Sequence, residues 1–190
     1  MNITSIVLAG VGGQGILLAS RITSRASVLA GYDVKLNEVH GMAQRGGSVI
    51  AQIRYGKEVY SPLVCKGGAR VLMALEQVEA LRYADYLAPE GLATVSDQTI
   101  LPVTVSSGKA VYPSDIYARL QRVFRNLQYI PAADIAAELG NSRAANTVLL
   151  GAMSKGLDLE TDCWHQAIAE CLKPATTDMN IQAFNRGRNI

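Results

Sequence analysis

The chain is poor in the residues that usually hold metals and redox centres. Its 190 residues include three cysteines and two histidines. Cys65, Cys163 and Cys171 form no CxxC pair, whereas iron–sulfur clusters and structural zinc both need grouped thiolates. An odd cysteine count without a secretory leader favours a reducing, cytoplasmic location. We therefore expect no metal and no iron–sulfur cluster in this chain.

Charge and long hydrophobic runs are also scarce. Charged residues make up 18% of the chain, against about 25% in an average protein. The net charge is +2, and the one local basic group (Arg119, Arg122 and Arg125) is expected on a solvated helix face, so the basic stripe of nucleic-acid binding is lacking. No apolar run approaches the ~20 residues that span a membrane. The weakly charged surface leaves two interpretations: a partner covers it, or the domain is rich in core.

Hydrophobic periodicity predicts an α/β first half. The opening run ITSIVLAG (3–10) ends in glycines and lacks a basic leader region, so we interpret it as a buried strand and not as a signal peptide. Helical spacing follows over 15–31, and 32–39 is strand-like. Together they predict a strand–helix–strand unit. Further strands are expected at 48–56, 69–76 and 89–97, with a helix from the end of the 69–76 strand to about Tyr86.

The second half is expected to be mainly helical. Residues 99–105 and 109–114 are expected to be short strands or loops, and Ser114 is a plausible N-cap for a helix over 115–127. From Pro131 onward the pattern predicts helices almost throughout, and Thr161 is the candidate N-cap of one of them. The expected architecture is a Rossmann-like three-layer α/β sandwich with a mainly parallel sheet and a helical C-terminal part, forming one domain over 1–190.

A glycine-rich turn follows the first expected strand. Gly10, Gly12, Gly13, Gln14 and Gly15 match the pattern G-x-G-x-x-G between a strand and a helix, the context in which it binds nucleotides. Such a turn brings the backbone close to a ligand and aims the helix N-terminus at an anion. Glu38 stands about where a ribose-binding acid would be. The alternative is that the glycines only permit close packing between strand and helix.

The rest of the chain does not complete a dehydrogenase. His165 neighbours Trp164 in an amphipathic helix and is interpreted as structural, whereas His40 lies in a loop beside glycine and is the better functional candidate. A lone histidine without a paired acid is weak support for general acid–base catalysis. There is no Ser-His-Asp arrangement and no phosphate-loop lysine, so a hydride-transfer site is not complete.

A second motif, NEVHGMAQRGGSV, occupies 37–49. Arg45 precedes Gly46 and Gly47, which places a bidentate cation on backbone that bends easily around a ligand. Arg45 is expected either to clamp a carboxylate or phosphate, or to pair with Glu38 or cap a helix. Because both glycine motifs follow strands at the ligand-binding edge of an open α/β sheet, they are expected to share a site.

Four segments, GVGGQGILLAS, EVHGMAQRGGSV, SPLV and AANTVLLGA, together resemble the gamma-type subunit of the 2-oxoacid:ferredoxin (acceptor) oxidoreductases. The form HGMAQRGGSV is most similar to the beta subunit of indolepyruvate:ferredoxin oxidoreductase. The resemblance implies a subunit, inactive alone, of an enzyme that oxidatively decarboxylates a 2-oxoacid, such as indolepyruvate or another aryl pyruvate. That enzyme makes an acyl-CoA and reduces ferredoxin.

The resemblance also implies where cofactors and partners lie. Thiamine diphosphate and the iron–sulfur clusters would be on partner subunits, coenzyme A would be a co-substrate, and this chain would line the CoA or substrate side of the site. It would pack against the thiamine- and cluster-bearing subunit and meet ferredoxin through the complex, and a homodimer of this chain stays open as a further arrangement. No nucleic acid or membrane partner is implied. The matching positions are Gly10, Gly12, Gly13, Gln14, Gly15, Arg45, Gly46, Gly47, Ser48 and Asn146.

Alternatives remain open on the residues alone. One interpretation of Asn146 is a buried amide that ties a helix to a loop. The whole chain also fits a stand-alone NAD-dependent enzyme, suggested by the glycine turn with Glu38, or a regulatory module that binds a nucleotide or CoA.

Overall fold

The computed structural model describes residues 3–41 and 46–190, except for the side chain of His40. The predictions for Arg45 and for the side chain of His40 therefore lie outside the described residues.

A six-stranded sheet forms the middle layer, in the order β2-β3-β1-β4-β5-β6. The strands are β1 (Thr4–Val11), β2 (Asp33–His40), β3 (Ser48–Gly56), β4 (Ala69–Ala74), β5 (Leu87–Ser96) and β6 (Asn126–Ile130). β1, β4, β5 and β6 pair in parallel, whereas β3 is antiparallel to both β1 and β2. The expected mainly parallel sheet is confirmed, with β3 as its one reversed strand.

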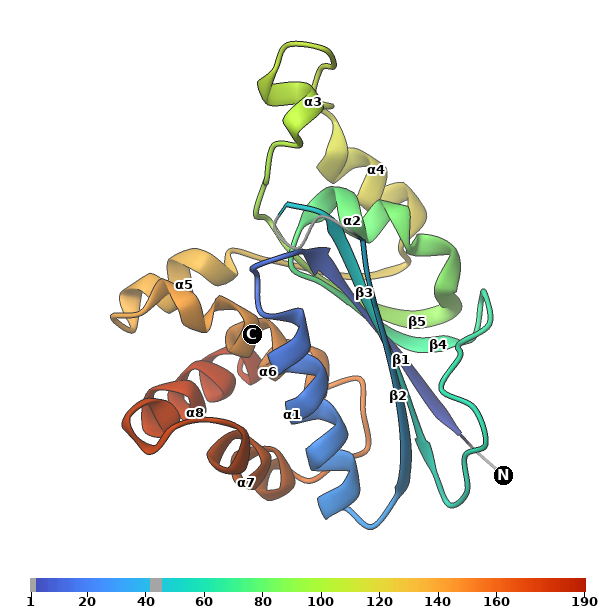
Figure 1. Cartoon of the computed structure of the whole chain (residues 1–190), viewed down its shortest axis with the longest axis vertical. Coiled ribbons are helices and arrows are strands. Elements are labelled where there is room, and N and C mark those ends of the chain that lie inside the picture. Colours follow the sequence, from blue (N-terminus) through green and yellow to red (C-terminus); the bar gives the residue numbers. More distant parts are fainter. Residues whose placement is uncertain (1–2, 42–45) are drawn as a thin grey trace.

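Helices cover both faces of the sheet (Figure 1). They are α1 (Ile16–Leu29), α2 (Gln77–Arg82), α3 (Val103–Ser106), α4 (Ile116–Val123), α5 (Ala132–Glu138), α6 (Ala145–Ser154), α7 (Thr161–Cys171) and α8 (Pro174–Arg188). Short 3-10 turns occupy Ala84–Tyr86 and Ser142–Ala144. The helical C-terminal part is confirmed.

Alternation along β1 separates two cores. Ile6 and Leu8 point into a core shared with α1, α6, α7 and α8, whereas Val7 and Ala9 point into a smaller core closed by α2 and α4. All four side chains are completely buried. A strand buried on both faces has an uninterrupted apolar sequence, which explains the run SIVLAG. The two cores make the three expected layers.

The expected strand–helix–strand unit is confirmed as β1, α1 and β2, but its two strands are not neighbours in the sheet. β2 runs in the same direction as β1, but β3 lies between them and pairs with both. In a dinucleotide-binding fold the second strand lies next to the first. β3, which begins at Ser48, is instead the antiparallel partner of β1, and the end of the second motif from Gly46 onward lies beside the glycine turn.

Four local predictions were wrong. The helix expected over 115–127 ends at Val123, and Asn126–Ile130 form β6, because tertiary pairing with β5 overrides helical spacing. The residue at the N-cap of α4 is Asp115, not Ser114, and Thr161 lies inside α7, after the N-cap residue Glu160. Residues 103–105, the end of the segment 99–105 that was expected as strand or loop, lie in α3.

Two glycines bring α6 and α8 into backbone contact. A Cβ atom added at Gly151 would lie 1.9 Å from the carbonyl oxygen of Phe184, and one at Gly187 would lie 1.8 Å from that of Val148. No side chain fits between the helices at these points. This contact holds the start of α6, which carries Asn146, over the glycine turn.

Candidate functional site

The glycine turn connects β1 to α1 at the edge where the parallel strands end (Figure 1). Gly13 and Gly15 have φ values of +106° and +87°, a backbone region that favours glycine. α1 begins after Gly15 with no side-chain cap and no acid in its first turn. The backbone N–H groups of that turn therefore keep the partial positive charge of a helix N-terminus.

The two glycine motifs lie side by side, as expected. The backbone N–H of Gly12 donates to the carbonyl oxygen of Gly47 at 2.8 Å, and that of Gly46 donates to Gly12 at 3.4 Å. These bonds extend the β1–β3 pairing by one step past the strand ends. They place the segment that follows Arg45 against the turn.

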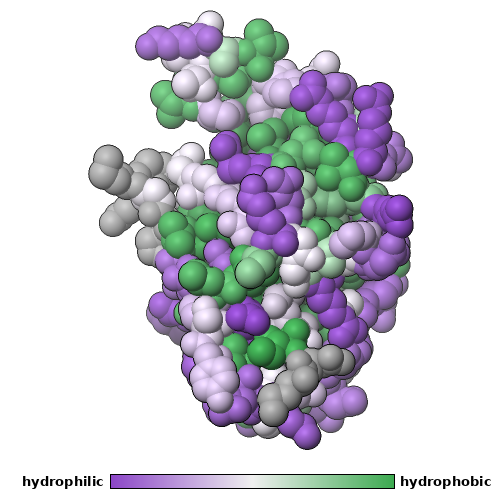
Figure 2. Space-filling model, turned by 90° about the vertical axis from the view of Figure 1, so that its right-hand side faces the viewer, coloured by the Kyte–Doolittle hydropathy of each residue, from purple (hydrophilic) through white to green (hydrophobic). Residues whose placement is uncertain are grey.

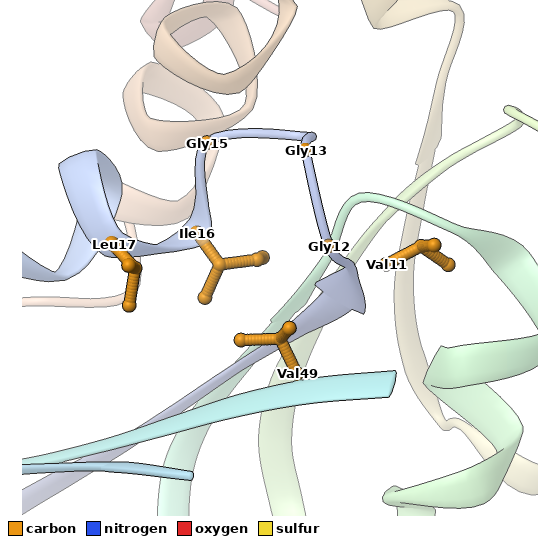
Figure 3. A pocket seen from close by; sticks show the side chains of 7 residues that line it. All are labelled: Val11, Gly12, Gly13, Gly15, Ile16, Leu17 and Val49. Atoms are coloured by element: carbon orange, nitrogen blue, oxygen red, sulfur yellow. The ribbon is translucent and has the colours of Figure 1, made fainter. Parts of the chain in front are cut away.

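Two hollows flank the glycine turn. The first, of about 470 Å³, is lined among the described residues by Val11, Gly12, Gly13, Gly15, Ile16, Leu17 and Val49. Figure 3 shows the side chains of Ile16 and Val49 below the turn, between α1 and β3. The second, of about 520 Å³, is walled by the other side of the turn, by Gln98 and Ile100, and by Arg143 and Asn146 before and within α6.

The side chain of Gln14 holds the turn from inside. Its Oε1 accepts from the backbone N–H of Val11 at 2.7 Å, and its Nε2 donates to the carbonyl oxygen of Leu75 at 2.7 Å and to Oε1 of Gln98 at 2.8 Å. Gly10 leaves room for it, since a Cβ there would lie 2.9 Å from Gln14 Oε1. Gln14 thus ties β1 to the ends of β4 and β5.

Asn146 holds the turn from the α6 side. Its amide is 4% exposed, and Nδ2 donates to the carbonyl oxygen of Gly15 at 3.3 Å. A Cβ at Gly15 would lie 2.5 Å from that nitrogen, so Gly15 is required for this contact as well as for its φ. Thr147 donates to Asn146 Oδ1 at 3.3 Å. These contacts favour the interpretation of Asn146 as a buried amide that ties a helix to a loop.

Ser48 is held in a polar cluster that sequence reasoning did not find. Its hydroxyl donates to the carboxylate of Glu79 and lies 3.0 Å from the hydroxyl of Tyr83. Glu79 is 5% exposed and also pairs with Arg82, with 3.0 Å between Nε and Oε1. The sequence signal was weak, because an acid within a short helical stretch usually faces solvent.

Two acids are next in sequence to residues that line the second hollow: Asp97 precedes Gln98, and Asp134 follows Ala133. Burial, reinforced by the charge of Asp134, raises the pKa of Asp97, the residue before Gln98.

Glu38 and His165 do not build a nicotinamide site. Glu38 accepts a hydrogen bond from the hydroxyl of Ser20 and sits on the edge strand β2, which β3 separates from the turn. Nε2 of His165 lies 2.8 Å from Oδ1 of Asn185, and its ring packs against that of Phe184 in a T-shaped arrangement. Both side chains serve local packing.

Metal ligands do not gather anywhere in the described part of the chain. Within it, no group of three or more His, Cys, Asp or Glu side chains is placed to hold a metal ion. Cys65 is exposed and Cys163 and Cys171 are partly buried, all as free thiols. None of the helices in residues 3–41 and 46–190 is long and apolar enough to cross a membrane.

Comparison with known proteins gives matches along almost the whole chain. The model of the pyruvate ferredoxin/flavodoxin oxidoreductase family matches residues 5–190. The indolepyruvate oxidoreductase subunit IorB of Thermococcus kodakarensis is 42% identical over 188 residues, which is 96% of this chain and 93% of that protein. The ketoisovalerate oxidoreductase subunit VorA of Methanothermobacter thermautotrophicus is 31% identical over 187 residues, 96% of this chain but only 35% of that protein.

A solved structure has the same fold. The 2-oxoglutarate:ferredoxin oxidoreductase from Magnetococcus marinus, with 2-oxoglutarate, coenzyme A and succinyl-CoA bound, gives a TM-score of 0.74 at 20% identity. The match covers 100% of this chain and 31% of that one. Together with the two joined glycine motifs, the sequence matches place the chain: it belongs to the pyruvate ferredoxin/flavodoxin oxidoreductase family and is a gamma-type subunit of a 2-oxoacid:ferredoxin oxidoreductase.

Proposed function

We propose that this chain forms the coenzyme A side of the reaction chamber in its oxidoreductase, and that a larger partner completes the chamber. The 2-oxoacid is proposed to be indolepyruvate or another aryl pyruvate, as the name of the relative at 42% identity suggests. Thiamine diphosphate, which would supply the decarboxylation chemistry, and the iron–sulfur clusters are assigned to the partner. The described residues of this chain gather no ligand set for a cluster.

One observation carries the proposal. The N-terminus of α1 carries no side-chain cap and lies between two hollows, with Arg143 lining the second. Coenzyme A carries phosphate groups, which helix N-termini and arginine both bind. The solved relative with bound coenzyme A has the same fold, which supports the choice of ligand.

The side chains of the turn support a backbone-mediated contact. The amide groups of Gln14 and Asn146 already have partners within the chain. Among the described residues, backbone N–H groups of the turn and the guanidinium of Arg143 can meet an anionic ligand. Arg45 is proposed as a second clamp, since Gly46 and Gly47 lie directly beside the turn.

The test uses the complex reconstituted from this chain and the larger subunit. Arg143→Ala and Arg45→Ala are each expected to raise KM for coenzyme A about tenfold, the usual effect of losing a charge-assisted hydrogen bond, while KM for the 2-oxoacid stays near its original value. Arg122→Ala is the matched control, because Arg122 is an exposed arginine on α4 that lines neither hollow. Unchanged KM values for coenzyme A in both variants would contradict the proposal.

A titration separates this function from a nicotinamide-dependent one. The purified chain is expected to give no saturable change in NADH fluorescence. Tight, saturable binding of NADH, or turnover of a 2-oxoacid by the chain alone, would contradict the shared chamber.

A further inference from the structure

A segment between β5 and α4 projects from the sheet edge. Residues 101–112, here called the arm, include α3 and extend beyond the rest of the fold at the top of Figure 1. Three of its apolar side chains face solvent: Leu101 is 54% exposed, Val103 80% and Val111 91%. Exposed apolar side chains gathered on one projecting segment are typical of a protein–protein contact.

The arm has almost no charge. Between residues 98 and 114, Lys109 is the one charged residue. The lobe at the top of Figure 2 accordingly has hydrophobic surface and one long hydrophilic side chain. Depletion of charge distinguishes the centre of a protein interface from ordinary surface, so the composition of the arm fits a buried position in an assembly.

The base of the arm is fixed by one buried carboxylate. Glu76 is 2% exposed, and its Oε1 accepts from the hydroxyl of Tyr112 at 2.8 Å and from the backbone N–H of Ile100 at 3.4 Å, which clamps both ends of the arm. Thr99 accepts from Nε2 of Gln77 in the same region. A base fixed before binding lowers the ordering cost of an association.

The arm also continues the wall of the proposed site. Gln98 and Ile100, at its base, line the second hollow together with the glycine turn. A protein bound to the arm therefore lies next to the opening of that hollow.

We propose that the arm is a docking element for the larger subunit of the same oxidoreductase, which in binding it covers the second hollow. Two observations favour this occupant over a second copy. The matched region makes up 35% of VorA and 31% of the Magnetococcus marinus chain, so related domains are joined to a much larger remainder. The residues at the base of the arm, Gln98 and Ile100, line a wall of the site that a partner must complete, and on that point the inference rests on the proposed function. An arm of twelve residues is an anchor within a larger interface, not the whole of one.

The experiment measures binding of the full chain to the purified larger subunit. Val111→Lys and the double variant Val103→Lys/Val111→Lys put charge on the arm, and Val28→Lys makes the same change at a valine that is 45% exposed at the far end of α1. The single arm variant is expected to weaken binding at least tenfold and the double variant further, while Val28→Lys binds like the original chain. Thermal unfolding of each variant checks that the fold is retained.

Two results would overturn the inference. The first is binding of the arm variants as tight as that of Val28→Lys. The second is a self-associating chain whose dimer, but not its binding to the larger subunit, is lost in the arm variants, which would assign the arm to a second copy. If the original chain does not bind the larger subunit at all, the proposed function fails with the inference. If the original chain binds the larger subunit and the arm variants bind it as tightly as Val28→Lys does, only the inference fails and the proposed function stands.

Discussion

Because of the contact between α6 and α8, replacing Gly151 by alanine is expected to lower the stability of the fold, which is opposite to the usual effect of this substitution within a helix. Replacing glycine by alanine inside a helix normally stabilises a protein by ~1 kcal/mol, because alanine has the higher helix propensity. At Gly151 the added methyl carbon would lie 1.9 Å from the carbonyl oxygen of Phe184 and 2.8 Å from the backbone nitrogen of Arg188. Backbone cannot turn aside as a side chain can, so the helices must separate.

The size of the effect follows from the distance. A carbon–oxygen contact settles near 3.3 Å, so α8 must shift by roughly 1.4 Å. Over-packing of a core usually costs about 1–3 kcal/mol, and a clash with backbone falls at or above the top of that range. After subtracting the propensity gain, Gly151→Ala is expected to lose ~2–4 kcal/mol, which lowers Tm by about 5–15 °C in a domain of this size.

Chemical denaturation with matched variants measures this. Gln182 is exposed on α8, so the difference between Gln182→Gly and Gln182→Ala gives the propensity effect alone. Gly187→Ala should cost less than Gly151→Ala, because Gly187 lies next to the end of α8 and that turn can unwind. The double variant should lose less than the sum, since one separation accommodates both methyl groups. A Gly151→Ala chain as stable as the original would refute the backbone contact.

Three further predictions concern the hydrogen bonds behind the site. Gln14→Glu removes the donor to Leu75 and Gln98 and should lower the free energy of unfolding by ~2–4 kcal/mol at neutral pH, with part of this stability restored on acidification. An equal loss of stability at pH 4 and pH 7, measured by chemical denaturation, would contradict this. Glu76→Gln leaves one oxygen for four donors and should cost about 1–3 kcal/mol in the same assay, whereas no loss would argue against the clamp. Burial, helped by Glu76, raises the pKa of Tyr112 to about 12, so the neutral phenol is favoured in the folded chain. The stability that this adds is full below pH 10 and is lost as the pH rises toward 12. An ultraviolet titration of the original chain, compared with Tyr112→Phe, should show that the Tyr112 phenol ionises at higher pH than the exposed tyrosines.

The sequence predicted the elements that have strong local signals. The apolar run of β1, the glycines before α1 and the periodicity of the C-terminal helices each identified their structure correctly. β6 was missed, because Asn126–Ile130 follows directly on a helical pattern and becomes a strand only by pairing with β5. The insertion of β3 between β1 and β2 was missed for a similar reason, since strand order depends on contacts that no local pattern records.

The sequence predicted that the two glycine motifs lie together, but not the side chains that hold them in place. The expectation that both glycine motifs share one edge is confirmed by the bonds between Gly12, Gly46 and Gly47. The buried acid Glu79 and the amide of Gln98 could not have been selected, since each depends on a partner far away in the sequence. Long-range hydrogen bonds of this kind are set by the tertiary fold.

The motif residues divide into two groups with different physical roles. The backbone of Gly12, Gly13 and Gly15 lines the hollows. The side-chain amides of Gln14 and Asn146 instead form hydrogen bonds within the chain. A side chain whose donors are already used cannot also bind a ligand without breaking them, at a cost of 1–3 kcal/mol for each buried group left unpaired. Substitutions at Gln14 or Asn146 should therefore act on ligand binding through the shape of the turn. Under the proposed function, recognition at this edge falls instead to backbone N–H groups and arginine, which suits an anionic ligand held between two protein surfaces.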